Sequence, residues 1–182
     1  KFVNDVRLKT RNCAMKQLVL TLIGKDKAGL VEQLATVING HHGNWTASNL
    51  SHLGGYFAGI LQVEVAPEHA AQLSQALEAI EGLDIKIHQG IDSTVNEHQL
   101  LKFVITGNDR PGIVRELSSV IKHKGTNIIH FESSKQSAPN WGVPLFNAIA
   151  TVELPEGLNK EEVVRALEAI AADVVVDVEN LH

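Results

Sequence analysis

The chain has 182 residues, of which 44% are apolar and 20% charged, and its net charge is −5 with both signs scattered along it. This balance argues against electrostatic binding of nucleic acid, since phosphate binding relies on clustered Lys and Arg. One cysteine, Cys13, cannot form an internal disulfide or a cysteine-based zinc site, which fits a reducing, cytoplasmic compartment.

The first 14 residues are mixed polar and basic, and they lack the apolar segment of a secretion signal. The regular hydrophobic pattern starts directly after Met15. Further along, no apolar run reaches the roughly 18 residues that a membrane-spanning helix needs. We expect an N-terminal extension over 1–14, a first domain over 15–92, a linker over 93–97 and a second domain over 98–182.

The first domain predicts the order strand, helix, strand, strand, helix, strand. Large apolar residues alternate in QLVLTLI, which indicates a strand, and the octet GKDKAGLV over 24–31 then turns the chain into a helix. The strands NWTASNLSHL and YFAGILQVEV follow, joined as a hairpin by Gly54 and Gly55, and LDIKIH ends the domain. The two helices carry apolar stripes of helical period: Leu30, Leu34, Val37 and Ile38, then Leu73, Leu77 and Ile80.

The same plan is repeated in the second domain. A second octet, GNDRPGIV, occupies 107–114, and the segment ALEAI at 76–80 recurs at 166–170. The order βαββαβ is the ferredoxin-like plan, so the predicted fold class is α+β, with two tandem modules that each place helices on one face of an antiparallel sheet. The other face is only partly apolar, since alternation places Glu64, Lys102 and Glu153 on it.

Two interpretations of the octets are open. In the structural one, Asp26 and Asp109 are helix N-caps, Pro111 lies in the first helical turn, and the glycines allow close packing. In the functional one, the free amide groups of a helix N-terminus bind a carboxylate beside Gly112, while Asp109 accepts an ammonium group. Asn127, which opens the next strand, can donate and accept hydrogen bonds. Together these groups predict a small zwitterion as the ligand.

The pattern strand–DRPGIV–helix–GTNI–strand inside a βαββαβ module resembles the ACT domain, a regulatory small-molecule sensor. In that family, amino-acid ligands often lie between the first strand–helix loop of one domain and the second strand of a neighbouring one. The resemblance implies these ligand-binding residues: Asp26, Gly29, Leu30 and Asn44 in the first copy, and Asp109, Pro111, Gly112, Ile113 and Asn127 in the second.

The second copy keeps the family motif fully. The first copy has Ala28 where Pro is usual and Lys27 where Arg is common. Serine-sensing members carry a His where this chain has Gly24 and Gly107, so the resemblance does not imply serine as the ligand.

Two such domains without a catalytic or DNA-binding domain resemble the glycine cleavage system transcriptional repressor family. This resemblance implies a non-enzymatic regulator that senses a small amino acid, with glycine as a candidate, and that binds a transcription activator rather than DNA. We also expect a homo-oligomer. The alternative is an ACT pair that regulates or assembles a metabolic enzyme in trans.

Other kinds of site find no support in the sequence. The nine histidines are dispersed apart from the adjacent His41 and His42, which predicts no metal site. Neither octet has a P-loop ending or a dinucleotide fingerprint, so no cofactor is expected. No constellation of acid, base and nucleophile emerges, so no enzyme activity is expected. Trp141, in the long loop SAPNWGVP, either anchors a protein partner or folds back over the sheet.

Overall fold

The structure is a computed structural model that describes residues 14–90, 99–137 and 142–180. The chain divides into two compact units between residues 93 and 94. We call their described parts module 1 (14–90) and module 2 (99–137 and 142–180). The predicted linker, residues 1–13 of the predicted extension, and Trp141 lie outside the described residues.

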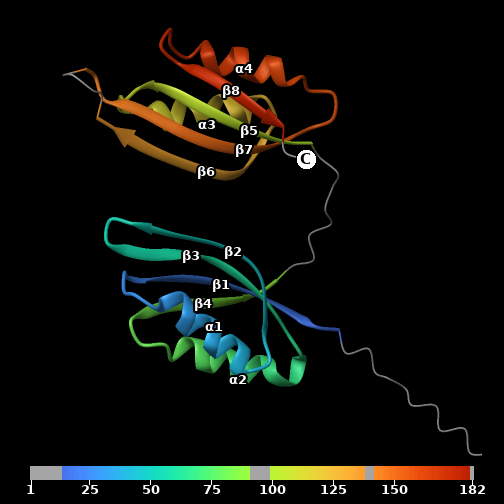
Figure 1. The fold of residues 1–182 in the computed structure, drawn as a ribbon. Helices are drawn as coiled ribbons and strands as arrows, with labels where there is room; N and C mark the ends of the chain where they lie inside the picture. The colour runs from blue at the N-terminus through green and yellow to red at the C-terminus, as the bar shows by residue number, and fades with distance from the viewer. Residues whose placement is uncertain (1–13, 91–98, 138–141, 181–182) are drawn as a thin grey trace, which may run out of the picture. The chain divides into compact units, whose positions relative to one another are not determined.

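Module 1 has the predicted order of elements. The bounds are β1 Lys16–Lys25, α1 Leu30–Gly40, β2 Asn44–Leu53, β3 Tyr56–Val65, α2 Pro67–Glu78 and β4 Leu83–Gln89. The strands form one antiparallel sheet in the order β2-β3-β1-β4, and both helices lie on the same face of it (Figure 1). Gly54 and Gly55 join β2 to β3 with φ angles of 61° and 82°, so the predicted glycine hairpin is confirmed.

Module 2 repeats this architecture. Its elements are β5 Gln99–Asn108, α3 Ile113–His123, β6 Asn127–Gln136, β7 Leu145–Leu154, α4 Lys160–Glu168 and β8 Val175–Asn180. The sheet order β6-β7-β5-β8 corresponds strand for strand to that of module 1. The predicted tandem of ferredoxin-like modules is therefore confirmed.

Each module has its own apolar core between the helices and the sheet. In module 1, Leu20 of β1 and Leu34 of α1 are fully buried, and Phe103 and Leu117 occupy the corresponding places in module 2. Full burial of one such side chain contributes about 1.5–3 kcal/mol. The predicted stripes thus face the core, although Ile80 reaches it from just beyond the end of α2. The octets lie where the first strand of each module passes into its first helix.

Candidate functional site

A β-turn brings each octet into its helix. In module 2, the Ile113 amide donates a hydrogen bond to the Arg110 carbonyl oxygen at 3.3 Å, and Gly112 has φ 93° and ψ −6°. These are the values of a type II turn, which favours proline at its second position and glycine at its third. Pro111 and Gly112 occupy those two positions, so the motif residues are explained first by turn geometry.

The octet of module 1 has a similar turn but lacks the proline of module 2. Gly29 has φ 90° and ψ 3°, and Ala28 stands where module 2 has Pro111. Among the described residues, the Leu30 amide makes no hydrogen bond equivalent to that of Ile113. The missing proline leaves this turn less constrained, because proline fixes φ near −65°.

The interpretation of Asp26 and Asp109 as N-caps is wrong. The helices begin at Leu30 and Ile113, with Gly29 and Gly112 as the N-cap residues and no side-chain cap on either. Pro111 likewise precedes the first helical turn instead of lying in it. The type II turn places three residues between each aspartate and its helix.

Each octet begins with a glycine that lies close to another part of its module. A Cβ atom on Gly24 would lie 2.2 Å from the carbonyl oxygen of Gly82. On Gly107 it would lie 3.3 Å from a methyl carbon of Val174. Module 1 therefore has no room for the histidine that serine-sensing relatives carry at this position.

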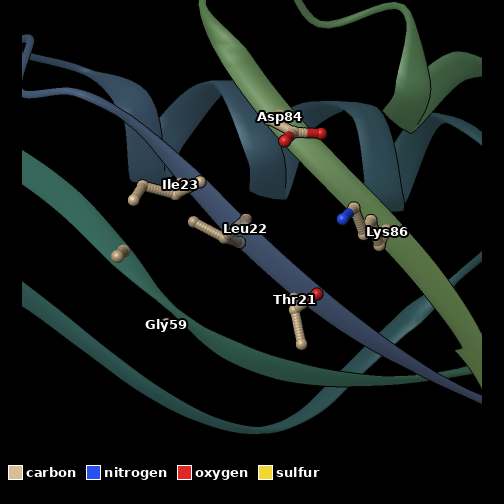
Figure 2. Close-up of a pocket in the computed structure, with 7 residues that line it drawn as sticks. Thr21, Leu22, Ile23, Gly59, Asp84 and Lys86 are labelled. Atoms are coloured by element: carbon tan, nitrogen blue, oxygen red, sulfur yellow. The ribbon is translucent and has the colours of Figure 1, made fainter.

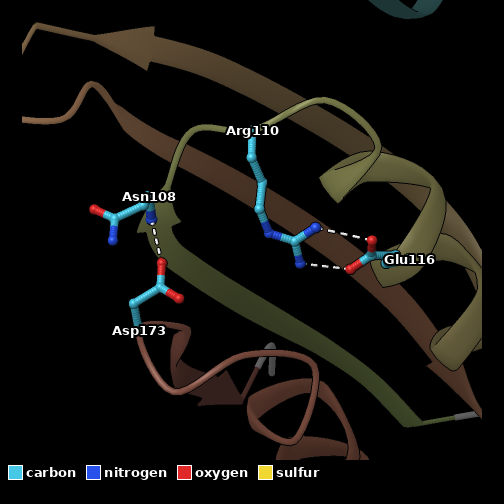
Figure 3. A network of polar contacts seen from close by, with 4 residues as sticks. All are labelled: Asn108, Arg110, Glu116 and Asp173. Atoms are coloured by element: carbon cyan, nitrogen blue, oxygen red, sulfur yellow. Dashed lines mark hydrogen bonds and ion pairs between the residues drawn. The ribbon is translucent and has the colours of Figure 1, made fainter.

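In module 2, the two charged residues of the octet, Asp109 and Arg110, each pair with a side chain of the same module. The Lys135 Nζ atom lies 2.8 Å from Asp109 Oδ2. The Arg110 guanidinium donates two hydrogen bonds to the carboxylate of Glu116, at 2.8 and 2.5 Å (Figure 3). This bidentate contact lowers the pKa of Glu116 and raises that of Arg110.

Module 2 also ties the octet backbone to its surroundings. The Asn108 amide donates to the Asp173 carboxylate at 2.7 Å, as Figure 3 shows, and the Asp109 amide donates to the Pro144 carbonyl oxygen at 2.7 Å. Asp109 and Arg110 are half-buried as a result.

The corresponding loop of module 1 has weaker charged contacts within the protein, although a surface cavity lies beside both octets. The cavity of module 2, of about 540 Å³, is lined by Pro111, Gly112, Arg115, Glu116, Ser119, Val120 and Ile170. The Asp26 carboxylate lies 3.6 Å from His52 Nε2, with both side chains about half exposed. A surface cavity of about 500 Å³ is lined by Lys25, Asp26, Lys27, Leu30, Gln33, Glu81 and Gly82. It combines two ammonium groups, an amide and carboxylates, which suits a ligand that carries both charges.

The sheet register separates the predicted asparagines from the octets. Asn44 lies opposite Glu64, which lies opposite Gln17, whereas the octet lies at the Lys25 end of β1. At about 3.3 Å per residue, some 26 Å separates Asn44 from the octet loop within one module. Asn127 of module 2 is placed equivalently, opposite Glu153. One amino acid could contact both groups only if the asparagine came from another copy of the module, for example from a second chain.

Leu30 and Ile113 are buried in the cores, so only their backbone groups can reach a ligand at the octet. Sequence reasoning did not identify Gln33, His52, Glu116 and Lys135 as neighbours of the site. Alignment of the two copies pairs Gln33 with Glu116, and this difference in charge was the available signal.

Other surfaces offer less chemistry. A cavity of about 310 Å³ lies on the helix-free face of the module 1 sheet, where Thr21 and Ile23 of β1 approach Gly59 of β3 and Asp84 and Lys86 of β4 (Figure 2). Within the described residues, no group of three or more His, Cys, Asp or Glu is placed to hold a metal ion. No helix of that part of the chain is long and apolar enough to cross a membrane.

The repeated modules, each with a glycine turn between its first strand and helix, define a tandem of small α+β domains. Residues 16–89 match the family model of the ACT domain. Module 1 therefore resembles the ACT domain over nearly its whole length, and module 2 repeats its fold, so that the chain has a tandem ACT-like fold.

Two solved structures resemble the chain over its length. An unknown protein from Galdieria sulphuraria is 27% identical with a TM-score of 0.81, and the match covers 92% of this chain and 99% of that one. A "putative glycine cleavage system transcriptional repressor" is 12% identical with a TM-score of 0.66 over the same shares of the two chains, which shows a common fold. No functionally curated protein matches the chain.

Proposed function

We propose that this chain is a non-enzymatic, cytoplasmic regulatory protein that binds a small amino acid at its octet loops, with glycine as the first candidate. Binding would change its affinity for a transcription activator. The proposed ligand-binding residues are those predicted from the sequence, with Leu30 and Ile113 acting through their backbone.

The carrying observation is the cavity of about 500 Å³ beside the octet of module 1. Lys25 and Lys27 offer positive charge to a carboxylate, and Asp26 offers negative charge to an ammonium group. A free amino acid carries these two charges a few ångströms apart, so a small zwitterion matches the lining better than a simple anion or cation does.

Regulation requires that a partner distinguish the bound from the free protein. A coupling free energy of about 1–3 kcal/mol would change partner affinity roughly 5- to 150-fold. The net charge of −5 favours a protein partner over direct binding to nucleic acid. The fold shared with the repressor-type structure supports a role in transcription, and a transcription activator is the partner that we propose.

Two measurements test the proposal. A thermal-shift screen against the standard amino acids should raise the melting temperature with at least one of them, because a ligand that binds only the native state stabilises it. Affinity purification from the native organism, with and without that amino acid, should recover a DNA-binding activator. Recovery of a metabolic enzyme would instead favour the alternative of an ACT pair acting on an enzyme in trans. No thermal shift with any amino acid would refute amino-acid sensing.

A further inference from the structure

The two octet loops have the same place in the fold but differ in the charged side chains that contact them. In module 2, the loop aspartate Asp109 contacts the ammonium group of Lys135, and the loop arginine Arg110 contacts the carboxylate of Glu116. These are the two charged groups that a free amino acid would bring. Module 2 therefore supplies from its own side chains what a zwitterion would supply from solution.

The register of the sheets identifies the matching residues in module 1. Lys135 lies opposite Phe146, which lies opposite Gly107. His52 likewise lies opposite Phe57, and Phe57 opposite Gly24. His52 is thus the counterpart of Lys135.

The second contact has no counterpart in module 1. Lys27 and Gln33 align with Arg110 and Glu116. In the described part of the chain, neither Lys27 nor Gln33 makes a side-chain hydrogen bond or ion pair. Both line the cavity instead.

Building on the proposed function, we infer that module 1 is the principal amino-acid receptor and that the Lys135–Asp109 and Arg110–Glu116 pairs make module 2 the weaker site. This assignment is the opposite of what the motif alone suggests, since module 2 matches the family sequence better. Pro111 and Arg110 complete the family motif in module 2. Pro111 also shapes its turn, and Arg110 also pairs with Glu116.

The carboxylate of Glu116 lies close to the glycine of the octet turn. Its Oε1 atom lies 3.9 Å from where a Cβ atom on Gly112 would stand. The carboxylate therefore lies beside the open side of the turn, where it lines the cavity of about 540 Å³ together with Gly112. An incoming carboxylate would meet this negative charge and would have to displace it from Arg110.

The solvent exposure of the paired side chains limits how strongly they can oppose ligand binding in module 2. Arg110 and Glu116 are 35% and 43% exposed, so their pair is worth no more than a surface ion pair. Such a pair changes an equilibrium by up to about fivefold. Two such pairs together would lower the affinity of module 2 by up to about 25-fold relative to a loop without them.

The test is site-resolved NMR on the full chain labelled with ¹⁵N, titrated with each standard amino acid in turn. We expect the amides of residues 24–33 to shift in a saturable way and those of 107–116 to shift only at concentrations many-fold higher. Saturation of 107–116 at equal or lower concentration would overturn the assignment while supporting amino-acid sensing. Absence of saturable shifts anywhere would refute the proposed function itself.

Exchange of residues between the copies gives a second test. The triple variant Lys27→Arg, Gln33→Glu, His52→Lys installs the module 2 pairs in module 1 and should weaken binding there by about 5- to 25-fold. The reverse variant, Arg110→Lys, Glu116→Gln, Lys135→His, should bring saturation of 107–116 into the range of module 1. Thr36→Ser, which also exchanges aligned residues but lies away from the octet charges, is the matched control. Unchanged affinities in both triple variants would refute the self-occupied loop.

Discussion

The ammonium group of Lys135 lies 2.8 Å from the carboxylate of Asp109, and this contact joins the edge strand β6 to the loop that follows β5. The sheet register gives Asp26 the neighbour His52 at the same place in module 1, 3.6 Å away. A fixed positive charge thus faces the aspartate in one module, and a group that is charged only when protonated faces it in the other. The duplicated fold keeps the geometry of the loop while changing its charge.

Replacement of Lys135 by Ala should loosen the octet loop of module 2 with little change in global stability. Lys135 is 63% exposed, so loss of its ion pair should lower the free energy of unfolding by less than about 1 kcal/mol. Hydrogen exchange of the amides over 109–113 should become faster, while the amides of β5 keep their protection. Equal acceleration in β5 would show that Lys135 supports the whole module and not the loop.

The glycine at the start of each octet should differ in its tolerance of a side chain. Gly24→Ala places a Cβ atom 2.2 Å from a backbone oxygen and should destabilise module 1 by about 1–3 kcal/mol. Gly107→Ala makes its closest contact, at 3.3 Å, with a methyl group of Val174, and it should cost less. Native-state hydrogen exchange of β1 and β5 reads the two modules separately. Equal losses would contradict the difference in backbone approach.

The sequence predicted the order of elements correctly because hydrophobic periodicity is strong and occurs twice. Alternation along β1 and β5 and the stripes on α1 and α3 agree in both copies, which removes most of the ambiguity of a single pattern. The start of each helix was misplaced for a physical reason. An aspartate before an apolar stripe is typical of an N-cap, but the following pair, Pro111-Gly112, forms a type II turn that delays the helix.

The charges at the site could not be predicted from the motif. Lys135 reaches Asp109 only because the register of β6 on β7 places it there, and register is a property of the folded sheet. Glu116 folds back over the turn of its own helix, which is a choice among several rotamers. A motif comparison therefore assigns the more complete octet to ligand binding, whereas side-chain pairing marks that octet as already occupied.

Ala28→Pro should stabilise module 1. Ala28 is the second residue of the same bend in which module 2 has Pro111, so a fixed φ fits the native turn and restricts the unfolded chain. Such substitutions raise the free energy of unfolding by about 0.4–1 kcal/mol. Pro111→Ala should lower the stability of module 2 by a similar amount. Urea-dependent hydrogen exchange in β1 and β5 measures both effects. A loss of stability in Ala28→Pro would mean that the backbone at Ala28 departs from the type II turn.

The contact between Arg110 and Glu116 should depend on pH in a defined direction. Hydrogen bonding to Arg110 lowers the pKa of Glu116 below its ordinary value of 4.5, with the charge of Arg115 acting in the same sense and burial opposing it. Because the folded pKa lies below the unfolded one, the stabilising contribution of this pair is fully present above pH 4.5 and is lost as the pH falls through the lower, folded value. The Arg110–Glu116 pair should therefore persist at neutral pH and be lost only in acid. A ¹³C titration of the Glu116 carboxyl group should give a midpoint below 4.5 that rises in the variant Arg110→Ala.

The control variant Arg115→Ala, which removes a charge without removing the hydrogen bonds, should raise the Glu116 midpoint less. A Glu116 midpoint that is the same with and without Arg110 would show that the two side chains do not interact in solution.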